Sequence, residues 1–208
     1  MTSSVDALLP LSLLHAVRSV DTPDDDVEAE YTLELRNKRL GLSETVYAQI
    51  KRYTDAVKRS QRPSHDEASG LARLIGRRPD AERVFRSAGR LLAAEAYGTI
   101  SPVTRRTVRT IPGFLGRPMA LRQMRRLSLR FLNGSVVRTG ASVQLVVPVS
   151  VTVEAAPGSA GCAFYGEVLK ELMRLLAGGD GMVEHVRCAA RGEGRCEWRA
   201  DWKRAGRA

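Results

Sequence analysis

The sequence predicts an α+β fold, in which N-terminal helices pack on a four-stranded antiparallel sheet and a C-terminal helix and β-hairpin carry a metal site. Apolar residues recur every three or four positions in segments such as 80–97 and 162–176, which is typical of amphipathic helices. Residues 134–154 and 182–202 each contain two apolar or alternating runs around a glycine turn, which indicates two hairpins. All three cysteines lie between residues 159 and 202. The metal site is therefore expected in this last third.

The length of 208 residues and the hydrophobic content of 43% predict one domain with a substantial core, preceded by an extension. We expect residues 1–62 to form the extension and residues 63–204 the domain. The most apolar run, 143–153, is too short to span a bilayer. The first residues lack the basic region of a signal peptide and are interrupted by Pro10. We therefore expect a cytoplasmic protein, in which clustered cysteines favour a metal over a disulfide.

The N-terminal extension combines an apolar and an acidic segment. Residues 5–20 are apolar and predict either a short helix or an arm that packs on a partner. Residues 21–30 are acidic and indicate a turn or linker. Residues 31–40 fit a short strand or a loop equally well. A helix is expected from Ser43 onward, because its apolar residues form one stripe.

Two further helices are predicted before residue 98. Ser64 and Glu67 form a capping box that starts a short helix ending at Ile75. Residues 80–97 form an amphipathic helix. Its inward positions are expected to be Val84, Phe85, Ala88, Leu91 and Leu92.

Residues 96–153 contain no acidic residue and nine arginines. Residues 119–131 predict a helix with a basic ridge on its flank, formed by Arg122, Arg125, Arg126 and Arg130. The Arg-rich region 105–130 fits an acidic protein partner, or a solvated face that pairs with the acidic N-terminal segment. No helix-turn-helix or zinc-finger spacing is present, so nucleic acid is not favoured as a partner.

The expected sheet consists of two hairpins. Residues 134–138 and 142–154 predict two strands joined by a turn at Thr139-Gly140. The helix that begins at Cys162 ends at Gly178, since glycine readily adopts the left-handed cap.

The C-terminal hairpin sets the predicted zinc site. If its loop is the three residues 191–193, Cys188 lies directly opposite Cys196, with Cβ atoms about 5 Å apart. Two thiolates at that separation can bind one tetrahedral zinc ion with Zn–S bonds of about 2.3 Å. Cys162 lies at a helix N-terminus, where the positive end of the helix dipole favours a third thiolate.

The fourth ligand is left open by the residues themselves. Strict alternation puts Glu184 on the same face of the strand as Cys188 and His185 on the other face. A bulge between His185 and Cys188 would reverse this, and both side chains are able zinc ligands. Other interpretations are buried free cysteines, a Cys188–Cys196 disulfide and a catalytic Cys–His pair, for which no orienting third group is visible.

These residues resemble the 4-vinyl-reductase domain family, which shares its fold with sensor domains of aromatic-responsive bacterial activators and with TRAPP trafficking subunits. The resemblance covers roughly residues 79–202. It consists of a cysteine that starts a helix, the run from His185 to Cys188, a glycine-containing turn at 191–194, and a cysteine before an aromatic, Cys196-Glu197-Trp198.

The resemblance implies a zinc site with four ligands. They are Cys162, Cys188 and Cys196, together with His185 at the position where the family has an acidic residue. The exchange of an acid for histidine leaves the donor set intact but removes one negative charge from the site.

The resemblance also implies a homodimer that binds a hydrophobic or aromatic small molecule and signals through a protein partner. The alternatives are an assembly subunit without a small ligand and an accessory protein of tetrapyrrole (bacteriochlorophyll) biosynthesis. Aromatic residues that could line a pocket are Phe85, Tyr97, Phe114, Phe131, Phe164, Tyr165 and Trp198. An enzyme is not favoured, because the sequence has no glycine-rich nucleotide fingerprint and no Ser-His-Asp constellation, and a four-ligand zinc site is structural.

Overall fold

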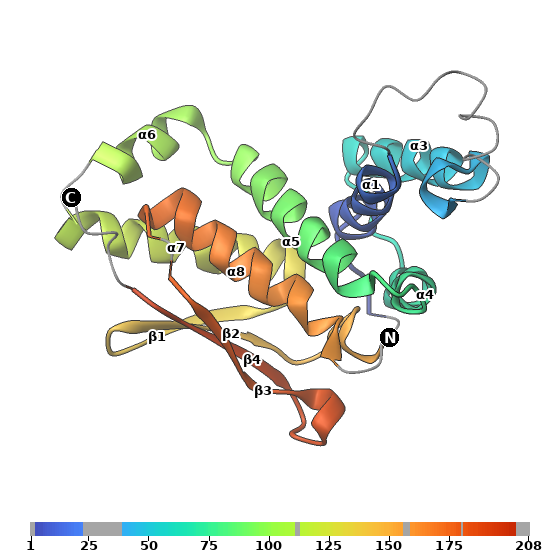
Figure 1. Cartoon of the computed structure of the whole chain (residues 1–208). Helices are drawn as coiled ribbons and strands as arrows, with labels where there is room; N and C mark the ends of the chain where they lie inside the picture. The colour runs from blue at the N-terminus through green and yellow to red at the C-terminus, as the bar shows by residue number, and fades with distance from the viewer. Residues whose placement is uncertain (1–2, 23–38, 111–112, 156–158, 180, 203–208) are drawn as a thin grey trace.

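A computed structural model of the chain describes residues 3–22, 39–110, 113–155, 159–179 and 181–202. It confirms the α+β fold with a four-stranded antiparallel sheet. The helices are α1 (Leu8–Asp21), α3 (Glu44–Lys58), α4 (His65–Gly76), α5 (Ala81–Gly98), α6 (Pro102–Thr110), α7 (Gly113–Leu132) and α8 (Cys162–Ala177). The strands are β1 (Ser135–Thr139), β2 (Ser142–Val147), β3 (Val183–Arg187) and β4 (Cys196–Asp201). Short 3₁₀ turns are η1 (Leu40–Leu42), η2 (Val153–Ala155) and η4 (Ala189–Arg191). Helices α7 and α8 lie against the sheet, while α1, α3 and α4 lie farther from it at one end of α5 (Figure 1).

The N-terminal helices begin where the sequence predicts. Ser43 caps α3 by accepting a hydrogen bond from the Val46 N–H, and Ser64 caps α4 by accepting one from the Glu67 N–H. Of the two alternatives for residues 5–20, the structure shows the helix. This helix, α1, packs on α5 and shares one hydrophobic cluster with the sheet. The boundary expected at residue 62 stays a prediction.

Two of the expected N-terminal segments cannot be compared with the structure. The acidic segment 21–30, apart from its first two residues, and the possible strand at 31–40, apart from its last two, lie outside the described residues. Asp21 itself is buried at the end of α1.

Helices α5 and α8 pack closely because α5 has a glycine at their contact. A Cβ atom on Gly89 would lie only 2.4 Å from the carbonyl oxygen of Phe164 in α8. Four of the five residues predicted to face inward are buried, namely Val84, Phe85, Ala88 and Leu92, whereas Leu91 is only partly buried. The close packing also covers Glu167, which the helical pattern assigns to the charged outer side of α8 but which is only 7% exposed.

The sheet has the strand order β1-β2-β4-β3, so the C-terminal hairpin joins the first hairpin through β4. Helix α7 contacts β1, while α8 contacts β3 and β4 (Figure 1). The face toward these helices is apolar and includes Leu145 and Trp198, both buried. The opposite face is polar, with Gln144 paired in register with Arg199.

The first hairpin follows the prediction at its turn, where Gly140 has a φ of +61°. The second strand was predicted to run to residue 154, but β2 ends at Val147. Pro148 lacks an N–H for the ladder, and the Ser150 hydroxyl accepts hydrogen bonds from the N–H groups of Thr152 and Val153. The chain therefore turns into η2 instead of continuing the strand.

The Arg-rich region forms two helices. Helix α6 was not predicted, and α7 begins at Gly113, before the predicted start at Met119. The four arginines of the predicted ridge are all exposed. Arg130 lies 3.7 Å from the carboxylate of Asp6, and Arg125 donates a hydrogen bond to the Val136 carbonyl. The ridge is therefore exposed in the described part of this chain, and an acidic partner for it stays a prediction.

No helix in the described part of the chain combines the length and the apolar character needed to cross a membrane.

Candidate metal centre

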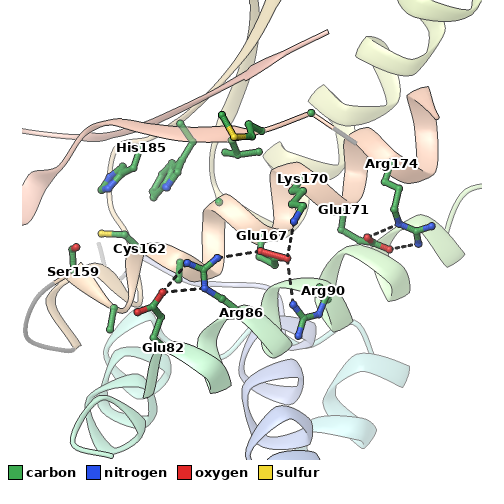
Figure 2. A pocket seen from close by; sticks show the side chains of 17 residues that line it. Glu82, Arg86, Arg90, Ser159, Cys162, Glu167, Lys170, Glu171, Arg174 and His185 are labelled. Atoms are coloured by element: carbon green, nitrogen blue, oxygen red, sulfur yellow. Dashed lines mark hydrogen bonds and ion pairs between the residues drawn. The ribbon is translucent and has the colours of Figure 1, made fainter. Parts of the chain in front are cut away.

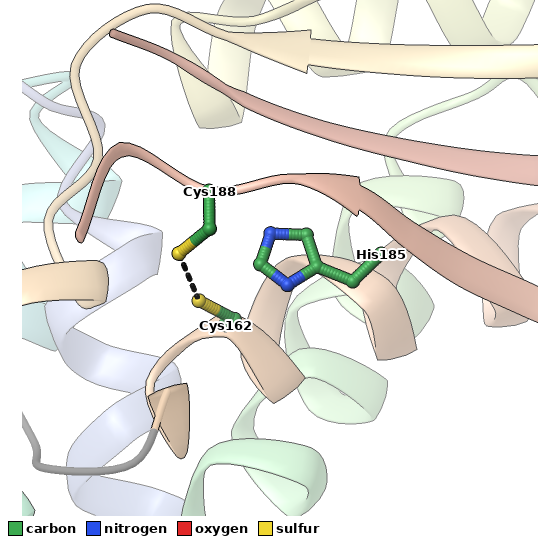
Figure 3. A group of neighbouring side chains, drawn as sticks. All are labelled: Cys162, His185 and Cys188. Atoms are coloured by element: carbon green, nitrogen blue, oxygen red, sulfur yellow. Dashed lines mark hydrogen bonds between the residues drawn. The ribbon is translucent and has the colours of Figure 1, made fainter. Parts of the chain in front are cut away.

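The four predicted ligands come from three elements that meet at one end of the sheet. Cys162 is the first residue of α8, His185 lies in β3, Cys188 follows β3 and Cys196 begins β4. Figure 3 shows Cys162 and Cys188 with their sulfur atoms facing each other and the His185 ring beside them.

The N-terminus of α8 is held in place by residue 152. The Thr152 hydroxyl donates a hydrogen bond of 2.6 Å to the carbonyl of Gly161, the residue before Cys162. A Cβ atom on Gly161 would lie 1.8 Å from the Thr152 carbonyl oxygen. Only glycine allows this approach, which fixes the position of the Cys162 thiol.

A β-bulge decides which side chain of β3 faces the cysteines. His185 pairs with Trp198, whereas Arg187 pairs with Glu197, so the register shifts between them. The shift puts His185 on the same face of the strand as Cys188. Glu184 lies on the opposite face, where its carboxylate forms an exposed salt bridge of 2.8 Å with Arg199. Of the two alternatives for the fourth position, the structure shows the bulge, with His185 toward the cysteines.

The predicted three-residue loop of this hairpin is wrong. Strand β3 ends at Arg187 and β4 begins at Cys196, with η4 between them. The cause is that the Cys188 N–H donates to the Glu193 carboxylate and the Ala189 N–H donates to the Cys196 sulfur, so neither can extend the ladder. The pairing of Arg187 with Glu197 nevertheless keeps the offset that puts Cys188 opposite Cys196.

The geometry of the cluster fits a tetrahedral ion. The ligand atoms of Cys162, His185 and Cys188 all lie within 4.8 Å of one another. The two sulfur atoms are 3.6 Å apart. A tetrahedral zinc ion with Zn–S bonds of about 2.3 Å requires sulfur atoms about 3.8 Å apart. All three cysteines are free and buried, so the alternative of a Cys188–Cys196 disulfide is not what the structure shows.

Cys196 lies beside this group without belonging to it. Its sulfur accepts a hydrogen bond of 3.2 Å from the Ala189 N–H. A hydrogen bond from the Cys162 thiol lowers the pKa of Cys196 most, and the Ala189 N–H and His185 lower it further, against the effect of burial. The same hydrogen bond, together with burial, raises the pKa of Cys162. Cys196 is therefore the first thiolate of this pair, which is the form that binds metal.

The ring of His185 is fixed by stacking, and one of its two nitrogen atoms lacks a polar partner among the described residues. It stacks on the indole of Trp198, with ring centroids 4.8 Å apart and planes 11° apart, and Trp198 stacks in turn on Tyr165. Among the described residues, no group forms a hydrogen bond with the buried His185 Nε2 atom. An unpaired buried polar atom costs about 1–3 kcal/mol, and coordination of a metal would satisfy it.

A groove of about 790 Å³ opens beside the cluster, between α5, α8 and β3 (Figure 2). Cys162 and His185 lie at one end, and Arg86, Arg90 and Lys170 extend along it (Figure 2). The sequence did not indicate these three cations as site residues. The available signal was Gly89, a glycine in the middle of a predicted helix, which permits the close helix packing that forms the groove.

The aromatic residues expected around a pocket mostly fill the core. Trp198 alone among those that the structure describes lines the groove. The side chain of Phe114 lies outside the described residues. The others are buried at Phe85, Tyr97, Phe131, Phe164 and Tyr165. The groove is therefore bordered by charged side chains and not by an aromatic box.

Neither a scan against protein-family models nor a search of curated proteins finds a match for this chain. The resemblance to the 4-vinyl-reductase domain family stays a prediction that rests on the spacing of residues 162–198.

Proposed function

We propose that this chain is a zinc-stabilised domain that binds a small molecule and acts through a protein partner. The zinc ligands would be Cys162, His185, Cys188 and Cys196. The observation that carries the proposal is the buried cluster, in which two sulfur atoms 3.6 Å apart lie beside an unpaired histidine nitrogen. Sulfur and imidazole ligands in a tetrahedral arrangement favour zinc over magnesium or calcium.

The expected role of the ion is structural. Four protein ligands leave no open position for water or substrate, which distinguishes structural from catalytic zinc sites. The position of Cys196 supports a four-ligand site, because the offset of the hairpin puts it opposite Cys188 and its sulfur accepts a hydrogen bond from the Ala189 N–H beside the cluster. An ion at this position would join the start of α8 to both strands of the C-terminal hairpin. It would thereby hold one wall of the groove in place.

The resemblance to the 4-vinyl-reductase domain family supports ligand sensing as the purpose of this arrangement, with a homodimer in the cytoplasm as the expected form. A second candidate is an assembly subunit that binds an acidic protein through the Arg-rich region 105–130. The exposed ridge on α7 favours it, since Asp6 is the one carboxylate that contacts the ridge among the described residues.

The test is the metal content of the untagged protein, purified without added metal and measured by elemental mass spectrometry. We expect about one zinc ion per chain in the wild type. His185→Ala should lose the zinc, whereas Glu184→Ala should keep it, because the adjacent Glu184 faces the opposite side of the sheet.

Two results would contradict the proposal. One is wild-type protein without metal and with three freely titratable thiols. The other is equal loss of metal in both variants, which would mean that the effect reflects general damage to β3. If the protein contained stoichiometric iron or cobalt in place of zinc, only the assignment of the metal as zinc would be wrong.

A further inference from the structure

We propose that the groove beside the cysteine cluster binds an organic anion with an apolar body, and that Arg90 and Lys170 bind its negatively charged group. The inference rests on the proposed function, since it names the ligand class of the same domain.

The charge around Glu167 carries the argument. Its nearly buried carboxylate is approached by Arg90 at 3.3 Å, by Arg86 at 3.5 Å and by Lys170 at 3.9 Å. Three cations thus share one carboxylate. The only other acidic partner of this group among the described residues is Glu82, which pairs with Arg86 at 2.7 Å. Three positive charges minus two negative charges leave one positive charge in excess. A ligand with one negative charge would balance it.

Two of these cations can reach a ligand without giving up their contacts. The side chains of Arg90 and Lys170 are half exposed and line the groove (Figure 2). Arg90 contacts Glu167 through Nη1 only, as far as the described residues show, so its other N–H groups can donate to a ligand. Glu167 lies beneath both side chains and orients them, which lowers the entropy that ligand binding must remove.

Part of the groove lining is apolar. Ala163, Gly166, Val183 and Trp198 belong to it. At Gly166 a Cβ atom would lie 3.4 Å from the Trp198 ring, so this part of the lining is glycine backbone next to an indole that is itself buried. The volume of about 790 Å³ is typical of small-molecule sites, which range from about 300 to 1,000 Å³. The groove thus offers an apolar surface to the body of a ligand and cations to its charged group.

The test compares two fluorescent probes that differ in charge. Anilinonaphthalene sulfonate carries one negative charge on an aromatic body, whereas phenylnaphthylamine has the same rings without the sulfonate. Their binding is titrated by fluorescence with the wild type, Arg90→Gln, Lys170→Gln and the control Arg122→Gln. Arg122 is an exposed arginine on α7 that does not line the groove, so this control has the same change in net charge.

We expect the dissociation constant of the sulfonate probe to rise about tenfold in Arg90→Gln and in Lys170→Gln, as for loss of one charge-assisted hydrogen bond. It should stay within about twofold of the wild type in Arg122→Gln. The uncharged probe should bind all four proteins with affinities within about twofold. Thermal unfolding of each variant verifies that it is folded. If Arg90→Gln does not fold, Lys170→Gln still tests the inference.

The inference is overturned if the sulfonate probe does not bind the wild type saturably. It is also overturned if Arg122→Gln weakens binding as much as the groove variants, or if both probes lose affinity equally. Zinc is measured in the same samples, so the two proposals fail separately. If the wild type contains no zinc but still binds the sulfonate probe more weakly after the groove substitutions, only the metal site is contradicted. If the wild type contains zinc but both probes respond alike to the substitutions, only the ligand class is contradicted.

Discussion

Replacing Gly161 with alanine is expected to destabilise the protein and to abolish metal binding. The new Cβ atom would lie 1.8 Å from the carbonyl oxygen of Thr152, whereas ordinary contact begins at 3.4 Å. The helix start or residue 152 must therefore move by the difference, 3.4 minus 1.8, or 1.6 Å. Thr152 is fully buried and cannot yield easily.

The magnitude follows from two contributions. Overpacking of this kind costs about 1–3 kcal/mol, and loss of the Thr152–Gly161 hydrogen bond costs about 1 kcal/mol. We expect a loss of about 3 kcal/mol in the free energy of unfolding. With a denaturant slope of about 2 kcal/mol per molar urea, the unfolding midpoint falls by about 1.5 M. Because metal–ligand distances tolerate only about 0.2 Å, a shift of this size at Cys162 should also remove the zinc.

Gly166→Ala is the matched control on the same helix. The nearest atom to its Cβ would be 3.4 Å away, which is ordinary contact. Alanine in the interior of a helix is favoured over glycine by about 1 kcal/mol, so this variant should be equally or more stable and should keep its zinc. Urea unfolding and metal analysis of both variants test the reasoning. A Gly161→Ala protein that retains zinc and unfolds within about 1 kcal/mol of the wild type would refute it.

Two further predictions concern the ion pairs that Arg78 forms with Asp21, at the end of α1, and with Asp80, before α5. Asp21 binds Arg78 at 2.6 and 2.9 Å and accepts the Gly41 N–H, so Asp21→Asn should cost about 3 kcal/mol in urea unfolding. The exposed control Asp55→Asn should cost less than about 0.5 kcal/mol, and equal losses would contradict the estimate. Hydrogen bonds from Arg78 lower the pKa of Asp80, so this carboxylate stabilises the fold above its ordinary pKa of about 3.9 and loses that contribution as the pH falls below that value and through the lowered pKa. The stability of Asp80→Asn should therefore depend less steeply on pH in this range, and an unchanged slope in unfolding experiments would count against the assignment.

Much of the fold follows from local features of the sequence. Ser43 and Ser64 start their helices because a side-chain oxygen satisfies a backbone N–H a few residues away. The apolar stripe of 80–97 and the glycine turn at Gly140 act within one element, and both lie where the sequence predicts. The cysteine spacing also predicts that Cys188 and Cys196 belong to opposite strands of one hairpin.

The identity of the fourth residue at the cluster was decided by tertiary structure. A shift of one residue along β3 exchanges its two faces, and it depends on hydrogen bonds that Glu193 and Cys196 accept across the loop. The alternation of residues along the strand contains no information about these hydrogen bonds. The folded loop therefore decides that His185, and not Glu184, faces the cysteines.

The groove was likewise decided by packing between elements distant in sequence. The apolar spacing of α8 assigns Glu167 to the solvent, because that spacing contains no information about how closely α5 packs on this side of the helix. Gly89 lets α5 approach, and Arg86 and Arg90 then reach the carboxylate from the neighbouring helix. The sequence by itself determined the capped helix starts, the turn at Gly140 and the elements that carry the three cysteines, since these depend on nearby residues. Only the tertiary structure decided which charges meet, since that depends on how closely two backbones can approach.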